Sequence, residues 1–507
     1  MTSTVESIDP RTGRTVESVG TETSSADLEA IVGRAEAAAP AFEAAGRRLR
    51  ARLLRAVADQ LESRRSAVIQ VGARETALTE ARLGGELTRT VYQARLFADV
   101  VEEGGYLEAT IDHAGDTPMG SGPDLRRMLV PIGPVAVFGA SNFPLAFSVP
   151  GGDTVSALAA GCPVVVKAHP SPPATSLLTF EALTAAAQEV GAPDGVLGMV
   201  FGQQAGADLV AHPAIRAVSF TGSQSGGRAL LEIINARSQP IPFYGELSSL
   251  NPVVITAGAT AARPQQLAEG LVASVTGSGG QLCTKPGLIF VPSGAEGDVL
   301  VEHAAQLVNE APAATLLNQR ISEAYDEISS DLEGLSSLTV VARGCRADGD
   351  GFDVAPKLLQ VKASDLQDEE LEECFGPVAV IARYEAEDLS RALDGLPASL
   401  TGTIHAETDE TATIQSLTST FKGKSGRVLY DGWPTGVLVS WAQQHGGPWP
   451  STNTLHTSVG TSAVRRFLRP VTWQNAPAAV LPEELQDSFE SIPRRVDGTL
   501  VTPRQGG

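Results

Sequence analysis

The sequence contains few cysteines. Four are spread across 507 residues, and no pair has a C-x-x-C or other metal-ligand spacing. This usage excludes a disulfide framework and predicts a protein of a reducing compartment without a metal centre. We expect Cys162, Cys345 and Cys374 to be packing or surface residues, which leaves Cys283 to be explained.

Positive charge and long apolar runs are also scarce. Lys and Arg number 38 against 59 Asp and Glu, which gives a net charge of −21. So acidic a chain is not expected to bind nucleic acids or anionic membranes. No apolar run approaches the ~20 residues of a membrane span, and the polar start MTSTVESIDPRTG lacks the apolar region of a secretory signal. We therefore expect a cytoplasmic protein of two or three domains.

Alternating strands and helices are present over about 120 residues in the middle of the chain. The strands are short, apolar and uninterrupted, which is typical of a parallel doubly wound sheet covered on both faces. A second strand and helix series begins after Cys283, with a strand at 288–291 and a helix at 297–309. The strands of the first series lie at 135–139, 163–167, 196–201, 217–221, 242–247 and 252–256.

Helices and a projecting arm flank this pattern. Apolar residues at helical spacing predict one helix around residues 49–61 and a second from about Leu87 to Glu103. The segment 113–130 is rich in Gly, Pro and Asp, so we expect a loop or hairpin arm there. The tail, 463–507, is expected to lie on the surface or on a neighbouring subunit.

Polar residues follow the strands of the first sheet, where parallel sheets bind ligands. Asn142 follows the first strand, Lys167 ends the second, Gly222 and Ser223 open a helix, and Glu246 ends a further strand. The helix start could take a phosphate. The dinucleotide-binding fingerprint G-x-G-x-x-G is absent, so these residues alone are a weak signal of cofactor binding. Each also has a structural alternative: Asn142 could cap a helix, Glu246 could join an ion pair, and Lys167 could lie along the surface.

The loop GSGGQLCTKPG, residues 277–287, carries Cys283 among small residues. Its glycines let the backbone approach a substrate closely and leave amide groups free to point at it. Such a cysteine could be a nucleophile whose oxyanion is held by its own N–H. It could equally be a small buried residue of a tight loop.

The stretches SNFP, VVVKAHP, FTGS, GELSSLNP, GQLC and EECFGPV occur in this order, and together they resemble the aldehyde dehydrogenase superfamily. FYGELSSLNPVV, GQLCTKPG, DGWPTGV and QHGGPWPSTN look like its 2-oxoglutarate semialdehyde (2,5-dioxovalerate) dehydrogenases, whose relatives include bacterial long-chain aldehyde dehydrogenases. The resemblance implies an α/β fold and a homodimer or homotetramer. Its parts would be a Rossmann-like NAD(P)-binding domain (1–112 and 133–245), an α/β catalytic domain (246–445), and a β oligomerisation arm with the C-terminal tail (113–132 and 446–507).

The resemblance assigns the chemistry to three residues. Cys283 would attack an aldehyde and pass through a thiohemiacetal to a thioester, with the oxyanion held by its own N–H and by Asn142. Glu246 would then activate water to release the acid. A Glu in an apolar setting is expected to have a raised pKa suited to a base.

The cofactor residues also follow from the resemblance. NAD-specific members often carry a Glu three residues after the lysine, but here that position is Pro170. With no carboxylate to repel a 2′-phosphate, we expect NADP to be preferred, with NAD as the alternative. The implied cofactor-binding residues are Lys167, Ser141, Pro170, Gly222, Ser223, Glu373 and Phe375.

A small-molecule aldehyde is the expected substrate, and 2,5-dioxovalerate would need an Arg for its carboxylate. Arg89 and Arg95 are the candidates, and Phe143, Ala146 and Phe147 are expected to line the tunnel. If no Arg faces the tunnel, a fatty or general aliphatic aldehyde becomes the better substrate.

Three other functions stay open on sequence alone. A CoA-acylating dehydrogenase is disfavoured by Glu246, because a hydrolytic base would divert the thioester to acid. A silent structural or binding protein on this scaffold would not need Cys283, Glu246 and Asn142 together. A simple nucleotide-binding module would not need the thiol.

Overall fold

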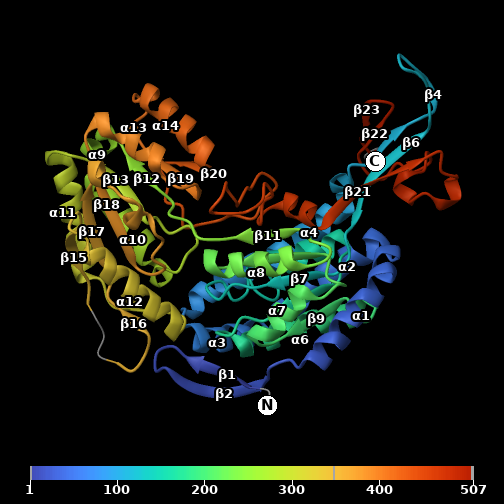
Figure 1. Cartoon of the computed structure of the whole chain (residues 1–507), viewed down its shortest axis with the longest axis horizontal. Helices are drawn as coiled ribbons and strands as arrows, with labels where there is room; N and C mark the ends of the chain where they lie inside the picture. The colour runs from blue at the N-terminus through green and yellow to red at the C-terminus, as the bar shows by residue number, and fades with distance from the viewer. Residues whose placement is uncertain (1–2, 346–348, 504–507) are drawn as a thin grey trace.

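The computed structural model describes residues 3–345 and 349–503, and its two halves each centre on one sheet (Figure 1). The chain begins with a hairpin around the Asp9–Gly13 turn, and four helices follow it. These elements are β1 (Thr4–Asp9), β2 (Arg14–Thr21), α1 (Ser25–Ala44), α2 (Gly46–Ser63), α3 (Arg65–Thr76) and α4 (Glu80–Glu103). The predicted helix around 49–61 is confirmed as part of α2, and α4 starts seven residues before the predicted Leu87 because Thr79 caps it.

The first sheet has five parallel strands in the order β11-β10-β7-β8-β9. Its elements are β7 (Val135–Phe138), β8 (Val164–Lys167), β9 (Leu197–Val200), β10 (Ala217–Thr221) and β11 (Phe243–Glu246), with α5 (Gly152–Ala160), α6 (Pro173–Val190), α7 (Gln203–Ala211) and α8 (Gln224–Ala236). Phe138 pairs with both Lys167 and Phe220, and Thr221 pairs with Glu246. The strand ends are therefore aligned, which brings the predicted polar residues to one edge.

The second half holds a seven-stranded sheet in the order β15-β17-β18-β13-β12-β19-β20. Only β15 is antiparallel to its neighbour among these described strands. The strands are β12 (Val253–Ile255), β13 (Leu288–Pro292), β15 (Thr339–Arg343), β17 (Lys357–Lys362), β18 (Val378–Tyr384), β19 (Ser399–His405) and β20 (Ser425–Tyr430). The helices are α9 (Ala257–Ala262), α10 (Pro264–Thr276), α11 (Ala295–Glu310), α12 (Gln319–Gly334), α13 (Ala386–Gly395) and α14 (Thr411–Lys424). A short pair, β14 (Ala314–Thr315) and β16 (Asp353–Val354), lies beside it.

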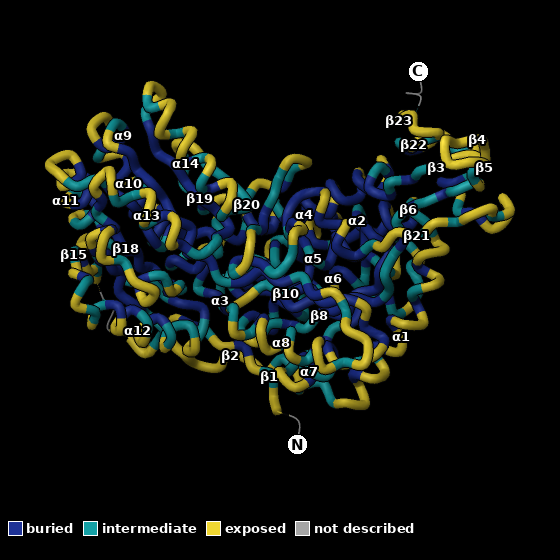
Figure 2. Tube along the Cα trace, turned by 45° about the horizontal axis from the view of Figure 1, so that its top comes forward, coloured by how far each residue is buried: buried dark blue, intermediate teal, exposed yellow. Residues whose placement is uncertain are grey.

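A third sheet, in the order β21-β6-β3-β22-β23, joins the predicted arm to the C-terminal tail. It comprises β3 (Thr110–Asp112), β6 (Leu125–Pro131), β21 (Leu468–Gln474), β22 (Arg494–Val496) and β23 (Thr499–Val501). The hairpin of β4 (Gly115–Thr117) and β5 (Gly120–Gly122) extends from it, away from both halves (Figure 1). Figure 2 shows this hairpin exposed, whereas buried backbone runs through the centre of each half. At its tip, Met119 is 95% exposed.

The α/β architecture predicted from the sequence is confirmed, including the parallel sheet, the second strand and helix series and the hairpin arm. One segment differs from the expected division of the chain. Residues 445–459, most of which we grouped with the tail, run beside the end of β11, where Leu247 N–H donates to Ser451 O at 2.8 Å. Over the part of the chain that the structure describes, no helix has the length and apolarity needed to cross a membrane.

Candidate active site

The loop that carries Cys283 is held by the side chain of Asn251, which lies between β11 and β12. Asn251, which has a left-handed backbone with φ 52°, donates its side-chain amide to Cys283 O at 2.8 Å and to Lys285 O at 3.0 Å. Its side-chain oxygen accepts from Ser249 and Thr401. The nucleophile loop is thus fixed by a fully buried amide whose hydrogen bonds are satisfied.

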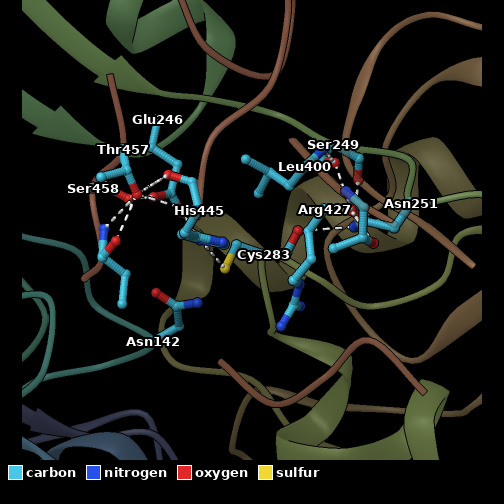
Figure 3. Close-up of polar contacts among 12 residues, drawn as sticks. Asn142, Glu246, Ser249, Asn251, Cys283, Leu400, Arg427, His445, Thr457 and Ser458 are labelled. Carbon is cyan, nitrogen blue, oxygen red and sulfur yellow. Dashed lines mark hydrogen bonds and ion pairs between the residues drawn. The ribbon is translucent and has the colours of Figure 1, made fainter. Parts of the chain in front are cut away.

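Cys283 lies beside a buried pair formed by Glu246 and His445 (Figure 3). His445 Nε2 is 3.0 Å from Glu246 Oε1 and 3.7 Å from Cys283 Sγ. The other carboxylate oxygen, Glu246 Oε2, accepts from Ser458 Oγ at 2.7 Å. One imidazole nitrogen therefore reaches both the thiol and the carboxylate, which is the geometry of a nucleophile next to a base.

The pKa values of Glu246 and Cys283 are shifted in opposite directions. Burial acts to raise the pKa of Glu246, but the charge of His445 and hydrogen bonds from His445, Ser458 and Cys283 outweigh burial and lower it. The expected raised pKa of Glu246 is therefore wrong, because the carboxylate has donors around it rather than an apolar wall. Burial, followed by the charge of Glu246, raises the pKa of Cys283 well above its ordinary value. At neutral pH, the resting site holds a thiol and a carboxylate.

Asn142 lies near Cys283, in the turn after β7 (Figure 3). Its side-chain amide donates to Gln281 O at 2.9 Å, two residues before the cysteine. One amide hydrogen is engaged by this bond, so the second is available to an oxyanion on a carbon bonded to Cys283.

An arginine and two phenylalanines lie near the thiol, and one of the two predicted arginines lies elsewhere. The guanidinium of Arg89 is 4.9 Å from the ring centre of Phe147, whose ring centre is 6.1 Å from that of His445 and 5.3 Å from that of Phe143. Arg89 Nη2 is buried without a hydrogen-bond partner in the described structure. In contrast, Arg95 pairs with Asp59 of α2 at 2.9 Å and is half exposed, so it does not join this cluster.

Ala146 takes part through its backbone. Its side chain is fully buried, and its N–H donates to Glu86 Oε1 at 2.8 Å, next to the same bond from Leu145. Glu86 also pairs with Arg82, whose guanidinium is 4.3 Å from the ring centre of Phe143. This network fixes the turn that presents Asn142 and Phe143.

The edge of the first sheet can hold a dinucleotide. Lys167 is half-buried at the end of β8, and burial lowers its pKa to about 8. Gly206 packs on this lysine: a Cβ there would come within 3.3 Å of Lys167 Cγ. The N-terminus of α8 is exposed at Gly222 and Ser223, with Ser223 Oγ accepting from Gly226 N–H at 3.2 Å. Exposed N–H groups at the start of a helix suit an anionic phosphate.

The remaining predicted cofactor residues approach this edge from both halves. Ser141 is buried after β7, and Pro170 is exposed in the turn after β8. Glu373 and Phe375 are half-buried before β18. Burial raises the pKa of Glu373 to about 7, against the charge of Lys285 and hydrogen bonds from the Ser248 side chain and the Ser249 main chain.

Residues 1–447 match the Aldehyde dehydrogenase family. The chain belongs to this family. As an aldehyde dehydrogenase it uses NAD(P) to oxidise an aldehyde, as the sequence motifs predicted.

Curated relatives match over nearly the whole chain. It is 43% identical to "Alpha-ketoglutaric semialdehyde dehydrogenase 2" of Azospirillum brasilense, covering 98% of this chain and 96% of that one. It is 40% identical to "Alpha-ketoglutaric semialdehyde dehydrogenase" of Acinetobacter baylyi, covering 94% and 93%. Among solved structures, 1-pyrroline-5-carboxylate dehydrogenase from Thermus with bound NAD superposes with a TM-score of 0.80 at 22% identity, covering 93% of this chain and 90% of that one. This structure supports the fold.

Sequence reasoning missed three residues of this aldehyde dehydrogenase site. His445 and Ser458 contact Glu246, and Arg427 of β20 lies beside Cys283 (Figure 3). Arg427 donates to Pro434 O at 2.8 Å and to Gly436 O at 2.7 Å, so it holds the DGWPTGV loop. The signal available was that His445 and this loop both fall in motifs singled out for the resemblance.

Glu246, Cys283 and His445 also form a group whose ligand atoms lie within 4.8 Å of one another. A metal on His445 Nε2 would require a proton on Nδ1, yet Nδ1 is buried without a partner in the described structure. Metal-bound histidines almost always donate that N–H to an acceptor. The arrangement suits acid–base chemistry better than metal binding.

Proposed function

We propose that this enzyme oxidises 2,5-dioxovalerate, which is alpha-ketoglutaric semialdehyde, to 2-oxoglutarate with NAD(P). The names of the two relatives at 43% and 40% identity support this substrate. The observation that carries the proposal is Arg89 Nη2, a buried guanidinium nitrogen without a partner in the described structure, next to Phe147. A carboxylate at the far end of a short aldehyde would complete the hydrogen bonds of that guanidinium.

The reaction begins with a proton transfer within the buried cluster. Cys283 gives up its thiol proton to the carboxylate of Glu246, with which it shares a hydrogen bond and which His445 Nε2–H holds in place. Its sulfur then bonds to the aldehyde carbon, and the carbonyl oxygen becomes an oxyanion. Cys283 N–H and the Asn142 amide stabilise that oxyanion, because they are in place before the charge develops.

The bound nicotinamide supplies the acceptor for the hydride that leaves the adduct. The protein residues then handle water and protons. Glu246 releases the thiol proton to solvent, since its lowered pKa favours the ionised form at neutral pH. With the substrate carbon now a thioester on Cys283, Glu246 accepts a proton from water, and the hydroxide attacks that carbon. The carbon–sulfur bond breaks, and the leaving thiolate takes the proton from Glu246 and becomes the thiol again. Ser458 holds the carboxylate during both steps.

The cofactor would lie along the aligned strand ends. Lys167 would bind the adenosine ribose, Gly222 and Ser223 a phosphate, and Glu373 with Phe375 the nicotinamide ribose and ring. Ser141 would border the same channel. These roles rest on matching family motifs and, for Lys167, Gly222 and Ser223, on the aligned ends of β8, β7 and β10.

NADP is the proposed preferred cofactor. Pro170 is exposed and offers no carboxylate that would repel a 2′-phosphate. Arg320, at the start of α12, adds positive charge at the same turn: burial, followed by the charges of Lys167 and Arg320, lowers the pKa of His169 to about 3. Asn318 fastens the helix to the turn through a 2.7 Å bond to Ser171 Oγ.

We also propose that the arm mediates a homodimer or homotetramer. The edge strands β21 and β23 and the exposed β4–β5 hairpin offer unpaired backbone and apolar surface, which include Met119 and Leu500. Exposed strand edges of this kind pair readily with another chain.

Steady-state kinetics with 2,5-dioxovalerate and a series of unbranched aliphatic aldehydes tests the function. We expect a much higher kcat/KM for the dicarbonyl acid, and no turnover by Cys283→Ala although it still binds NADP. A kcat/KM that rises with alkyl chain length would instead identify a fatty or general aldehyde dehydrogenase. Turnover by Cys283→Ala near that of the wild type would contradict the nucleophile.

The deacylation step has its own test. Glu246→Gln should release one equivalent of reduced cofactor in a burst and then stall, because the thioester is no longer hydrolysed. Mass spectrometry of the stalled protein should detect the acyl group on Cys283. A linear time course without trapped acyl-enzyme would contradict the role of Glu246.

A further inference from the structure

Lys285 is a buried cation that the proposed mechanism does not use. It lies two residues after the nucleophile and is 3% exposed. Its ammonium donates to Val378 O at 2.7 Å and to Cys374 O at 3.1 Å. Because a buried charge is costly unless it is compensated, a lysine here needs a reason beyond filling space.

The two carbonyls lie on either side of the Phe375–Gly376–Pro377 turn. This turn belongs to the EECFGPV segment, in which Glu373 and Phe375 are the proposed cofactor residues. Lys285 therefore ties both ends of that turn to the loop of Cys283 through one side chain.

The same two loops also touch backbone to backbone. Gly280 has φ 69°, and a Cβ on it would overlap the main chain of Gly376 and Pro377. A Cβ on Gly376 would in turn overlap the ring of Tyr325. Because no side chains separate the two loops, their backbones pack directly on each other. The hydrogen bonds of Lys285 then fix the position of one loop relative to the other.

Electrostatics link Lys285 to Glu373. Burial is the main cause that raises the pKa of Glu373, and the charge of Lys285 is the largest cause that opposes this rise. Burial lowers the pKa of Lys285 itself, and Cys374 and Glu373 oppose that shift. The ammonium thus favours the ionised form of Glu373, which is the form that accepts hydrogen bonds from ribose hydroxyls.

We infer that Lys285 is a positioning residue that holds Glu373 and Phe375 in register with Cys283 for the nicotinamide end of the cofactor. The inference rests on the proposed cofactor roles of those two residues. Removing the ammonium should loosen the turn and weaken cofactor binding. It should leave chemistry that needs only Cys283, Glu246 and Asn142 largely intact.

A purely structural anchor is the alternative, and Lys357 offers a matched control. Lys357 is also buried in the second half of the molecule, and its ammonium is 2.8 Å from both Ser329 Oγ and Glu333 Oε1. Replacing either lysine by methionine removes a buried charge of the same kind. Of the two ammonium groups, that of Lys285 bonds to the carbonyls flanking the turn that carries Phe375. Lys357 reaches the turn through its main-chain N–H, which donates to Pro377 O at 2.9 Å and is kept in the methionine variant.

The test compares Lys285→Met and Lys357→Met with the wild type. NADP affinity is measured by calorimetry, and p-nitrophenyl acetate hydrolysis without cofactor reports on Cys283 alone. For Lys285→Met we expect affinity to fall about tenfold, the loss of one charged hydrogen bond, with ester hydrolysis within about twofold of the wild type. Lys357→Met should keep the NADP affinity and the rate of ester hydrolysis of the wild type. Unchanged affinity in Lys285→Met, or equal losses in both assays, would overturn the inference.

A second variant covers the case in which Lys285→Met does not fold. Lys285→Arg keeps the charge and can reach the same carbonyls, so its NADP affinity should stay within about threefold of the wild type. A tenfold loss of NADP affinity in Lys285→Arg, with normal ester hydrolysis, would overturn the inference. It would show that the shape of the side chain, not the bridging charge, governs the site. Wild-type protein that binds no NADP, or an affinity unchanged by Glu373→Gln, would count against the proposed cofactor roles instead.

Discussion

At the scale of residues, the site depends on one imidazole nitrogen shared between a thiol and a carboxylate. His445 Nε2 lies 3.0 Å from Glu246 Oε1 and 3.7 Å from Cys283 Sγ. The raised pKa of Cys283 means that the thiol must lose its proton during the reaction rather than before it. The proposed acceptor for that proton is Glu246, whose ionised carboxylate accepts from His445 Nε2–H and Ser458 Oγ.

His445→Asn should lower kcat/KM by about a hundredfold, because Glu246 loses the hydrogen bond that positions it as a base. Iodoacetamide labelling of Cys283 at pH 7 should slow as well, measured in a Cys345→Ser background that removes the exposed thiol. Because the pKa of Cys283 is raised, labelling of the resting wild type should accelerate as the pH rises above 7. Labelling and turnover near wild-type values in His445→Asn would exclude this role.

Arg89→Gln should lower kcat/KM for 2,5-dioxovalerate by about 10- to 100-fold, because a charged hydrogen bond to the carboxylate is lost. The same variant should oxidise an unbranched aliphatic aldehyde at close to the wild-type rate. Arg95→Gln is the matched control on the same helix, since Arg95 pairs with Asp59. Equal losses for both substrates would point to a structural role for Arg89.

Arg320→Ala should raise the KM for NADP about tenfold while changing the KM for NAD little, because only NADP carries the 2′-phosphate. The ratio of the two kcat/KM values is the measurement. A parallel change for both cofactors would place Arg320 away from the 2′-phosphate.

The sequence analysis singled out Cys283, Glu246 and Asn142, which the structure brings together, but not His445. Three of the four stand in motifs where a strand end or a glycine loop explains the residue type. His445 is separated from its partners Cys283 and Glu246 by 162 and 199 residues, and no local pattern indicates such a contact. The sign of the Glu246 pKa shift was unpredictable for the same reason, since it depends on neighbours far away in the chain.

At the scale of elements, the active site lies where loops from two sheets meet. Strand β11 brings Glu246, and the loop after α10 brings Cys283. The Cys283 loop also packs directly on the Phe375–Gly376–Pro377 turn, because Gly280 lets its backbone approach that of Gly376.

Gly280→Ala should destabilise the protein by roughly 1–3 kcal/mol or more and abolish dehydrogenase turnover, since it combines φ 69° with a backbone overlap. Gly277→Ala, in the same loop, has open space around its Cβ position and should change stability by under about 0.5 kcal/mol. Denaturant unfolding measures both variants. Similar stabilities would show that the loop can move to admit the methyl group.

Element positions were the most predictable part of the fold. Strands such as 288–291 and 217–221 were predicted to within a residue, because each is a short apolar run bounded by Gly or Pro. Sheet order was not predictable, since the sequence does not state which strands pair. The isolated antiparallel bridge between Glu246 and Thr452 was unpredictable for the same reason.

At the scale of the whole molecule, the arm and the tail form one sheet although they are far apart in sequence. Strand β6 pairs with β21 over seven residues, from Leu125 with Gln474 to Pro131 with Leu468. The resemblance implied that both belong to one oligomerisation unit, and the shared sheet is consistent with that proposal.

Residues 115–122 form the β4–β5 hairpin, and replacing them with a two-residue turn should lower the number of subunits in the oligomer. Light scattering coupled to size exclusion should then find a smaller assembly than for the wild type, because the most exposed part of the arm is gone. A Met119→Lys variant tests the apolar tip alone. An unchanged mass for both would move the subunit contact elsewhere.

The segment that bears His445 and Ser458 continues through the buried turn Thr461–Phe467 into β21 of the arm sheet. Arg466, within that turn, pairs with Asp153 at 2.7 Å, so the connection is rigid rather than slack. If subunits associate through the arm, subunit association is thermodynamically coupled to the positions of His445 and Ser458, which hold Glu246. Enzyme concentration then becomes a variable of catalysis, and specific activity should fall on dilution below the dissociation constant of the assembly.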